Sequence, residues 1–187
     1  MINKLIEIDK FLTLGINSFH SKWADFLMYW ASDIKIWIPL YALLIIFVII
    51  KYKKWSILII LMTILLIFCV DQSCNLLKNF FERLRPLRDE SFNFKLHLLE
   101  NVRAGKFGFV SGHAGNTFAL ATFVGYILRQ KIKCFKWILP VWAALVSYSR
   151  VYLGVHFLGD ILAGALLGVI YGLIFVLIFK KIQQKFA

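Results

Sequence analysis

Residues 149–160 read SRVYLGVHFLGD and lie between two apolar runs near the C-terminal end of the chain. The longer run follows directly, so we expect His156 and Asp160 in the opening turns of a membrane helix. Their spacing of four residues places them on one face of that helix. A carboxylate there costs about 2.5–3.5 kcal/mol on insertion scales unless it faces a partner inside the bundle. The nearest partner is the Nδ1–H of His156.

That hydrogen bond would leave Nε2 of His156 with a free lone pair, as a base or nucleophile needs. The alternative is a His–Asp pair that only holds helices together. Arg150, just upstream, favours a functional site, because a cation, an imidazole and a carboxylate then converge at one depth.

Composition predicts one integral membrane domain over residues 1–187. Hydrophobic residues make up 60% of the chain and aromatic residues 17%, and the mean hydropathy is +0.75. Several apolar runs approach the length of about 20 residues that crosses a bilayer. The net charge of +12 does not indicate nucleic-acid binding, because it forms no separate basic domain or tail. Cys69, Cys74 and Cys134 lack the spacing of a metal site or a disulfide framework.

Hydropathy predicts an all-α integral membrane helix bundle with about five transmembrane spans, residues 34–187. Residues 1–33 mix apolar and charged positions and are expected to form one or two amphipathic helices at the membrane surface; a poorly formed span is the alternative. The glycines 164, 168 and 172 repeat every four residues and predict a close helix contact. The expected spans are 34–50, 55–77, 109–128, 137–148 and 156–179.

Charge predicts the orientation of the bundle. Basic clusters follow the first, third and fifth spans, which puts them on one side, and an excess of Lys and Arg marks the cytoplasmic side. Residues 1–33, 79–106 and 149–155 would then lie on the other side. Seven basic residues from Lys78 to Lys106 break the rule there, which favours a functional reason for them.

Three groups of polar residues converge on that non-cytoplasmic end. Read singly, each group also fits a purely structural role: Lys78 could snorkel, Arg85 could be a loop charge, and His113 could be a helix-end histidine. Their common side favours a shared site. The groups are Lys78 with Arg85-Pro86, then Ser111-Gly112-His113, then Arg150, His156 and Asp160.

These residue types suit phosphate. Three fixed cations match a group with nearly two negative charges, and a helix N-terminus at Gly112 offers free donors to an anion. The residues make a poor zinc or hard-metal set, so the expected chemistry is metal-free phosphoryl transfer. Spacing alone leaves both water attack with His156 as base and a covalent route open.

The same residues resemble the three-part signature of the type 2 phosphatidic acid phosphatase (PAP2) superfamily, which also includes the vanadium haloperoxidases. The family pattern is Lys-x6-Arg-Pro, then Pro-Ser-Gly-His, then Ser-Arg-x5-His-x3-Asp. The first and third motifs are complete here, and the second has Val110 in place of proline. The resemblance covers roughly residues 55–180. The soluble haloperoxidase branch is disfavoured because this chain is apolar.

The resemblance implies a role for each matched residue. His156 would be the nucleophile that forms a phosphohistidine, and Asp160 would orient it. His113 would protonate the leaving oxygen and then activate water. No metal or cofactor is implied. The phosphate oxygens would be held by Lys78, Arg85, Ser111, Gly112 and Arg150.

A further hypothesis comes from the sequence itself. Asp71 lies two helical turns before Lys78 on the same face, with Asn75 between them. We expect Asp71 and Asn75 to support Lys78 or Arg150 from below. The alternative is that Asp71 only satisfies a neighbouring helix.

The predicted function is removal of a phosphate from a membrane lipid at the outer face of a bacterial inner membrane. Undecaprenyl diphosphate, lipid A phosphates and phosphatidylglycerol phosphate or phosphatidate are the candidate substrates. Residues 87–107 are expected to form a lid or a lipid-contacting rim, with His97, like His20, solvated. The alternative is a lipid-phosphate binding or transport protein without turnover; the oligomeric state does not follow from the sequence.

Overall fold

The computed structural model describes residues 2–186, and within that range it contains helices and no β-strand. The predicted all-helical fold is confirmed. The long helices are α1 (Ile2–Ser18), α2 (Lys22–Ser32), α3 (Ile38–Tyr52), α4 (Ser56–Phe81), α5 (Gly112–Arg129), α6 (Phe135–Tyr152) and α7 (Leu158–Lys185). The short 3-10 turns are η1 (Ile34–Trp37), η2 (Lys53–Trp55), η3 (Pro86–Arg88) and η4 (Asn93–Lys95).

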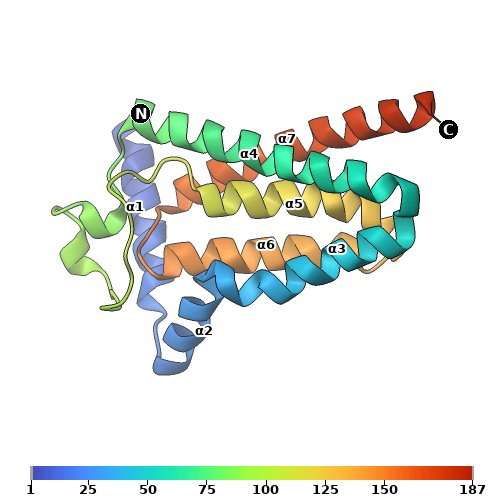
Figure 1. Ribbon diagram of the computed structural model, residues 1–187. Coiled ribbons are helices and arrows are strands. Elements are labelled where there is room, and N and C mark those ends of the chain that lie inside the picture. The colour runs from blue at the N-terminus through green and yellow to red at the C-terminus, as the bar shows by residue number, and fades with distance from the viewer. Residues whose placement is uncertain (1, 187) are drawn as a thin grey trace.

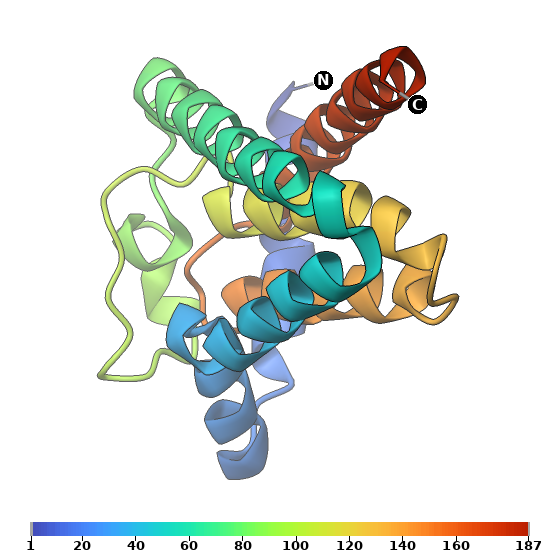
Figure 2. The ribbon, with the colours of Figure 1, turned by 45° about the vertical axis from the view of Figure 1, so that its right-hand side comes forward.

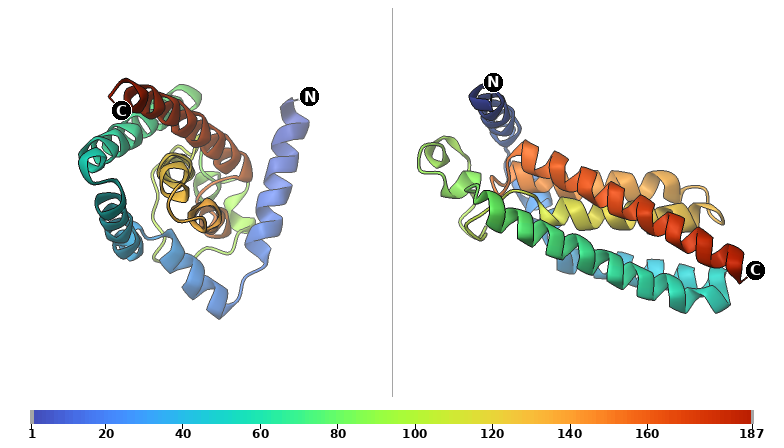
Figure 3. Two further views of the ribbon diagram at one scale, coloured as in Figure 1. Left: turned by 90° about the vertical axis from the view of Figure 1, so that its right-hand side faces the viewer. Right: turned by 90° about the horizontal axis from the view of Figure 1, so that it is seen from above.

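Helices α3 to α7 lie alongside one another, and α1 lies across one end of this bundle (Figure 1). The long loop between α4 and α5 and the connection between α6 and α7 lie at the same end as α1 and α2. The α3–α4 turn, the α5–α6 turn and the C-terminus lie at the opposite end (Figure 1). The end-on view in Figure 3 shows α5 and α6 surrounded by α3, α4, α7 and the two N-terminal helices. The basic clusters and the predicted polar site therefore lie at opposite ends.

Two segments are long and apolar enough to cross a membrane: Ile34–Phe81, which contains α3 and α4, and Leu158–Lys185. Their outer faces carry exposed aliphatic side chains, such as Ile57 at 70% and Leu162 at 61%. In water such a surface would be unfavourable, whereas it suits contact with lipid tails. Length and hydropathy thus support two segments, and the count of five spans stays a prediction.

The predicted close contact of the glycine face of α7 is confirmed. A Cβ atom at Gly168 would lie 2.1 Å from the carbonyl oxygen of Gly115 in α5, and one at Gly164 would lie 2.5 Å from that of Ser111. These two helices approach so closely because the facing positions carry no side chain. In Figure 2, α7 and α4 diverge on the outside of α5.

This contact gives a first prediction. Gly168→Ala should destabilise the protein by about 1–3 kcal/mol, because the added methyl forces two backbones apart. The measurement is thermal unfolding in detergent. Gly105→Ala is the matched control, since a Cβ atom there meets nothing within 4 Å. An unchanged melting temperature for Gly168→Ala would contradict the packing argument.

Three predicted boundaries are wrong, and each error lies beside the site. Helix α6 continues to Tyr152, so Arg150 stands in its last turn rather than in a connection over 149–155. Helix α7 starts at Leu158, so His156 precedes it instead of opening it. The reason is local backbone: Gly154 adopts φ +66°, which ends α6, and Phe157 is extended. Helix α4 continues past Lys78 until Glu82, at φ 46°, terminates it.

Candidate active site

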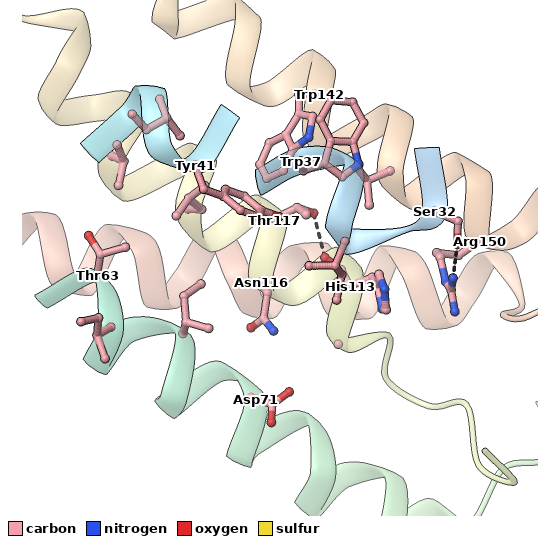
Figure 4. Close-up of a pocket in the computed structure, with 18 of the residues that line it drawn as sticks. Ser32, Trp37, Tyr41, Thr63, Asp71, His113, Asn116, Thr117, Trp142 and Arg150 are labelled. Atoms are coloured by element: carbon pink, nitrogen blue, oxygen red, sulfur yellow. Dashed lines mark hydrogen bonds between the residues drawn. The ribbon is translucent and has the colours of Figure 1, made fainter. Parts of the chain in front are cut away.

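The structure brings most of the predicted site residues to one cavity of about 660 Å³. The cavity begins at the end of the bundle near α1 and continues between α3, α4, α5 and α6 along apolar side chains such as Ile59 and Val124. His113, Asn116 and Arg150 line it in Figure 4. The predicted residues that line it are Asp71, Lys78, Arg85, Gly112, His113, Arg150 and His156. Ser111, Asp160 and Asn75 are not among the lining residues.

His156 is 1% exposed and lies between Asp160 and Arg85. Its Nδ1 is 3.3 Å from Oδ2 of Asp160, and its Nε2 is 2.9 Å from a guanidinium nitrogen of Arg85. Arginine can only donate, so Nε2 accepts and Nδ1 carries the proton. Burial, and then the charges of Arg85 and Arg150, hold the pKa of His156 well below its ordinary value. The imidazole is therefore neutral, with its lone pair directed at the guanidinium group of Arg85.

Arg83 and Arg85 reach the site from a short extended segment. Leu84 pairs with Phe107 in an isolated bridge, and the amide of Gly108 donates to the carbonyl of Arg83 at 2.8 Å. In extended backbone, residues two apart point to the same side, so both guanidinium groups face the α6–α7 connection. Arg85 donates to the carbonyls of Phe107 (3.0 Å) and Val155 (3.3 Å).

Arg83 was missed by the sequence analysis. It donates to Oδ1 of Asp160 at 2.9 Å and to Oδ2 of Asp9 at 2.6 Å. The alternation of Arg83 with Arg85 in an extended segment is the signal that could have found it.

Three cations of the cavity have no close counter-charge. Within residues 2–186, no carboxylate oxygen lies within 4.0 Å of a side-chain nitrogen of Lys78, Arg85 or Arg150. Arg150 donates to the hydroxyl of Ser32 at the end of α2, and its Nε has no partner in the described part of the chain (Figure 4). Half-buried cations without counter-ions are costly, so the cavity is suited to an anion.

The motif Ser111-Gly112-His113 starts α5. Ser111 is fully buried and acts as the N-cap: its hydroxyl lies 3.5 Å from the amide nitrogen of Ala114. A Cβ atom at position 112 would lie 3.5 Å from Nζ of Lys78, so glycine leaves room beside the ammonium group. The imidazole of His113 points into the cavity. Direct contact of Ser111 with phosphate stays a prediction.

Asp71 and Asn75 form a chain of hydrogen bonds toward Lys78. Asn75 donates to Oδ2 of Asp71 at 3.2 Å and accepts from Nζ of Lys78 at 3.3 Å. This geometry agrees with the hypothesis that the pair supports Lys78. Arg150 instead donates to Ser32, so no contact supports the alternative that Asp71 and Asn75 hold Arg150.

The loop over residues 87–107 packs against the N-terminal helices. Lys10 of α1 pairs with Asp89 at 2.8 Å. The expectation that His97 is solvated needs correction. Its Nε2 lies 3.0 Å from a carboxylate oxygen of Asp25, and its ring stacks on that of His20. Whether this loop selects the substrate stays a prediction.

Comparison with known proteins agrees with this geometry. The sequence profile of the PAP2 superfamily matches residues 55–184. The chain is 36% identical over 172 residues to a lipid A 4'-phosphatase of Bacteroides thetaiotaomicron, covering 88% of this chain and 74% of that protein. It is 34% identical over 165 residues to an undecaprenyl-diphosphatase of Sulfolobus acidocaldarius, covering 86% and 68%.

A crystal structure of similar fold is that of the transmembrane PAP2-type phosphatidylglycerolphosphate phosphatase from Bacillus subtilis. It superposes with a TM-score of 0.77 at 25% identity, and the match covers 96% of this chain and 88% of that one. The matched region contains all three motifs, and the structure gathers them around one cationic cavity. The chain therefore belongs to the PAP2 superfamily and is a phosphoric monoester hydrolase of the membrane.

Proposed function

We propose that this protein is a metal-independent lipid phosphatase that works through a phosphohistidine at His156. One observation carries the proposal: Arg85 donates to Nε2 of His156 at 2.9 Å while Nδ1 faces Asp160. A cation thus occupies the space in front of a neutral, oriented imidazole nitrogen. An incoming phosphate would move between the two, with its oxygens on Arg85 and its phosphorus toward Nε2.

The reaction has two steps. In the first, the lone pair of Nε2 attacks phosphorus, the bond from phosphorus to the lipid oxygen breaks, and His113 gives that oxygen a proton. The ring keeps its Nδ1 proton and becomes positively charged, which the Asp160 carboxylate stabilises. In the second, His113 takes a proton from water as the water oxygen attacks phosphorus. The P–N bond then breaks, its electrons return to Nε2, and inorganic phosphate leaves.

Cations supply the charge stabilisation in both steps. Lys78, Arg85 and Arg150 face the cavity without carboxylate partners in the described residues, so their charge is available to the equatorial oxygens of the transferring group. Donors of this kind bind phosphate and repel metal ions. The backbone at Gly112 adds a helix N-terminus beside Lys78.

The lipid nature of the substrate is supported by the walls of the cavity. From the cationic end it continues along Leu44, Val48, Ile59 and Val124, which suits an acyl or isoprenoid chain. The proposal includes five membrane spans, α3 to α7, with the cavity mouth facing away from the cytoplasm in an inner membrane. The basic clusters at the opposite end of the bundle support this orientation.

The test is a substrate panel with purified protein in detergent. Lipid A, undecaprenyl diphosphate and phosphatidylglycerol phosphate are compared by inorganic phosphate release, with and without EDTA. We expect release from at least one of them, with a rate that EDTA leaves unchanged. The lipid A arm is expected to give the highest kcat/KM, since the lipid A 4'-phosphatase is 36% identical over 88% of the chain, against 34% over 86% for the undecaprenyl-diphosphatase.

The outcomes separate the alternatives. Binding of all three lipids without phosphate release would favour a binding or transport protein. Loss of activity in EDTA that returns with a divalent cation would contradict the metal-independent mechanism. A higher kcat/KM for undecaprenyl diphosphate or phosphatidylglycerol phosphate than for lipid A would agree with the proposed mechanism and would contradict lipid A as the preferred substrate.

A further inference from the structure

One face of α1 carries a polar stripe, Asp9, Thr13 and Asn17, repeated every four residues. Thr13 and Asn17 are buried, at 0% and 1% exposure, although they lie on a helix whose other face exposes residues such as Phe11 at 75%. Buried polar side chains need partners. All three find them in the backbone on either side of the α6–α7 connection, where α1 crosses the end of the bundle (Figure 1).

Two free amides in the first turn of α7 are capped by side chains of α1. The N-cap position of α7 is Phe157, which has no side-chain acceptor for the free amides of the first turn. The amide of Leu158 donates to the hydroxyl of Thr13 at 3.0 Å, and that of Gly159 donates to Oδ1 of Asp9 at 2.8 Å. Both amides lie within three residues of His156.

The other end of the connection is fixed by the same helix. Asn17 donates to the carbonyl of Tyr152, the last residue of α6, at 2.7 Å. The side-chain oxygen of Asn17 accepts from the backbone amide of His97, so both the nitrogen and the oxygen of this side chain are hydrogen-bonded. His156 therefore sits on a short irregular segment that α1 holds at each end.

Asp9 also reaches His156 through two ion pairs. Its Oδ2 accepts from Arg83 at 2.6 Å, and Arg83 donates to Oδ1 of Asp160 at 2.9 Å while lying 4.1 Å above the ring of Phe157. Asp160 is fully buried, and its other oxygen accepts the Phe157 amide at 3.0 Å and faces Nδ1 of His156. Arg83 thus links the Asp9 carboxylate to the Asp160 carboxylate and fixes the position of Asp160.

We propose that Asp9 and Arg83 are positioning residues for His156, acting through Asp160, and that turnover requires α1 to be docked on the α6–α7 connection. The inference rests on the proposed function. Neither residue lines the cavity, so neither contacts the phosphate. Their loss should therefore lower kcat and leave KM nearly unchanged, because substrate binding uses other cations.

The test uses the full chain in detergent with the variants Arg83→Gln and Asp9→Ala. We expect kcat to fall about 10- to 100-fold in each, the range typical of residues that orient reacting groups from behind, with KM within about threefold. Arg83→Lys should recover part of the loss, since one ammonium group can pair with Asp160 but cannot span both carboxylates. Glu7→Ala, which removes an exposed carboxylate from the same helix, is the matched control.

A second readout does not depend on turnover. Hydrogen exchange at the Gly159 amide should speed up in Asp9→Ala and stay unchanged in Glu7→Ala, because Asp9 accepts the hydrogen bond of that amide. Unchanged exchange in Asp9→Ala would overturn the docking of α1, whatever the activity of the protein. Absence of activity on every lipid would instead reject the proposed function. A kcat within twofold of wild type in Arg83→Gln, or a loss confined to KM, would overturn the positioning role.

Discussion

His156→Ala should lower phosphate release at least about 10³-fold while the protein stays folded. The variant removes Nε2, the imidazole nitrogen whose lone pair accepts from Arg85 at 2.9 Å. Water would then have to attack phosphorus directly, with only the cations and His113 to assist. Arg85 keeps its hydrogen bonds to Phe107 and Val155, so the phosphate site should survive and KM should change little.

The loss is measured as kcat with the preferred lipid of the panel, beside His20→Ala as a control. His20 is exposed and stacks on His97, so its removal deletes an imidazole from the same end of the bundle without touching the cavity. Near-normal hydrolysis by His156→Ala would refute the assignment of this residue. A thiophosphate monoester made chiral at phosphorus with two oxygen isotopes, and hydrolysed in water of the third isotope, then separates nucleophile from base. Two displacements retain configuration, whereas a single attack by water inverts it.

Sequence spacing predicted those parts of the site that lie within one or two helical turns. Asp71, Asn75 and Lys78 share a face of α4 because the helix repeat puts them there, and the structure shows the chain of hydrogen bonds. His113 opens α5 because Ser111 caps it. The His156–Asp160 pair was also predicted, although for a partly wrong reason. The two side chains meet across a helix start, not along one helical turn.

Contacts between distant segments could not be predicted in the same way. Asp9 lies 150 residues before Gly159, and Arg83 lies 77 residues before Asp160. Their pairing depends on α1 crossing the end of the bundle, and no local pattern specifies that crossing. The stripe of Asp9, Thr13 and Asn17 does show that one face of α1 needs polar partners. It does not show that those partners are the backbone on both sides of His156.

His113→Ala should lower lipid phosphate release by about 10²- to 10⁴-fold, the usual contribution of a general acid or base. His113 lines the cavity together with His156 and Arg150 and is the remaining imidazole there. Its two proposed tasks can be separated by changing the leaving group. A lipid alkoxide needs a proton to depart, whereas the nitrophenolate of p-nitrophenyl phosphate departs as a stable anion.

With p-nitrophenyl phosphate, His113→Ala should therefore form the phosphohistidine at nearly the wild-type rate and then stall, because water attack lacks its base. The expected trace is a burst of about one nitrophenolate per enzyme followed by a slow steady state. The burst should be absent in the double variant with His156→Ala, since no covalent intermediate can form. If His113→Ala slows the burst as much as it slows lipid hydrolysis, His113 is not the general acid. A steady state as fast as wild type would deny it the role of base and leave water activation to another group.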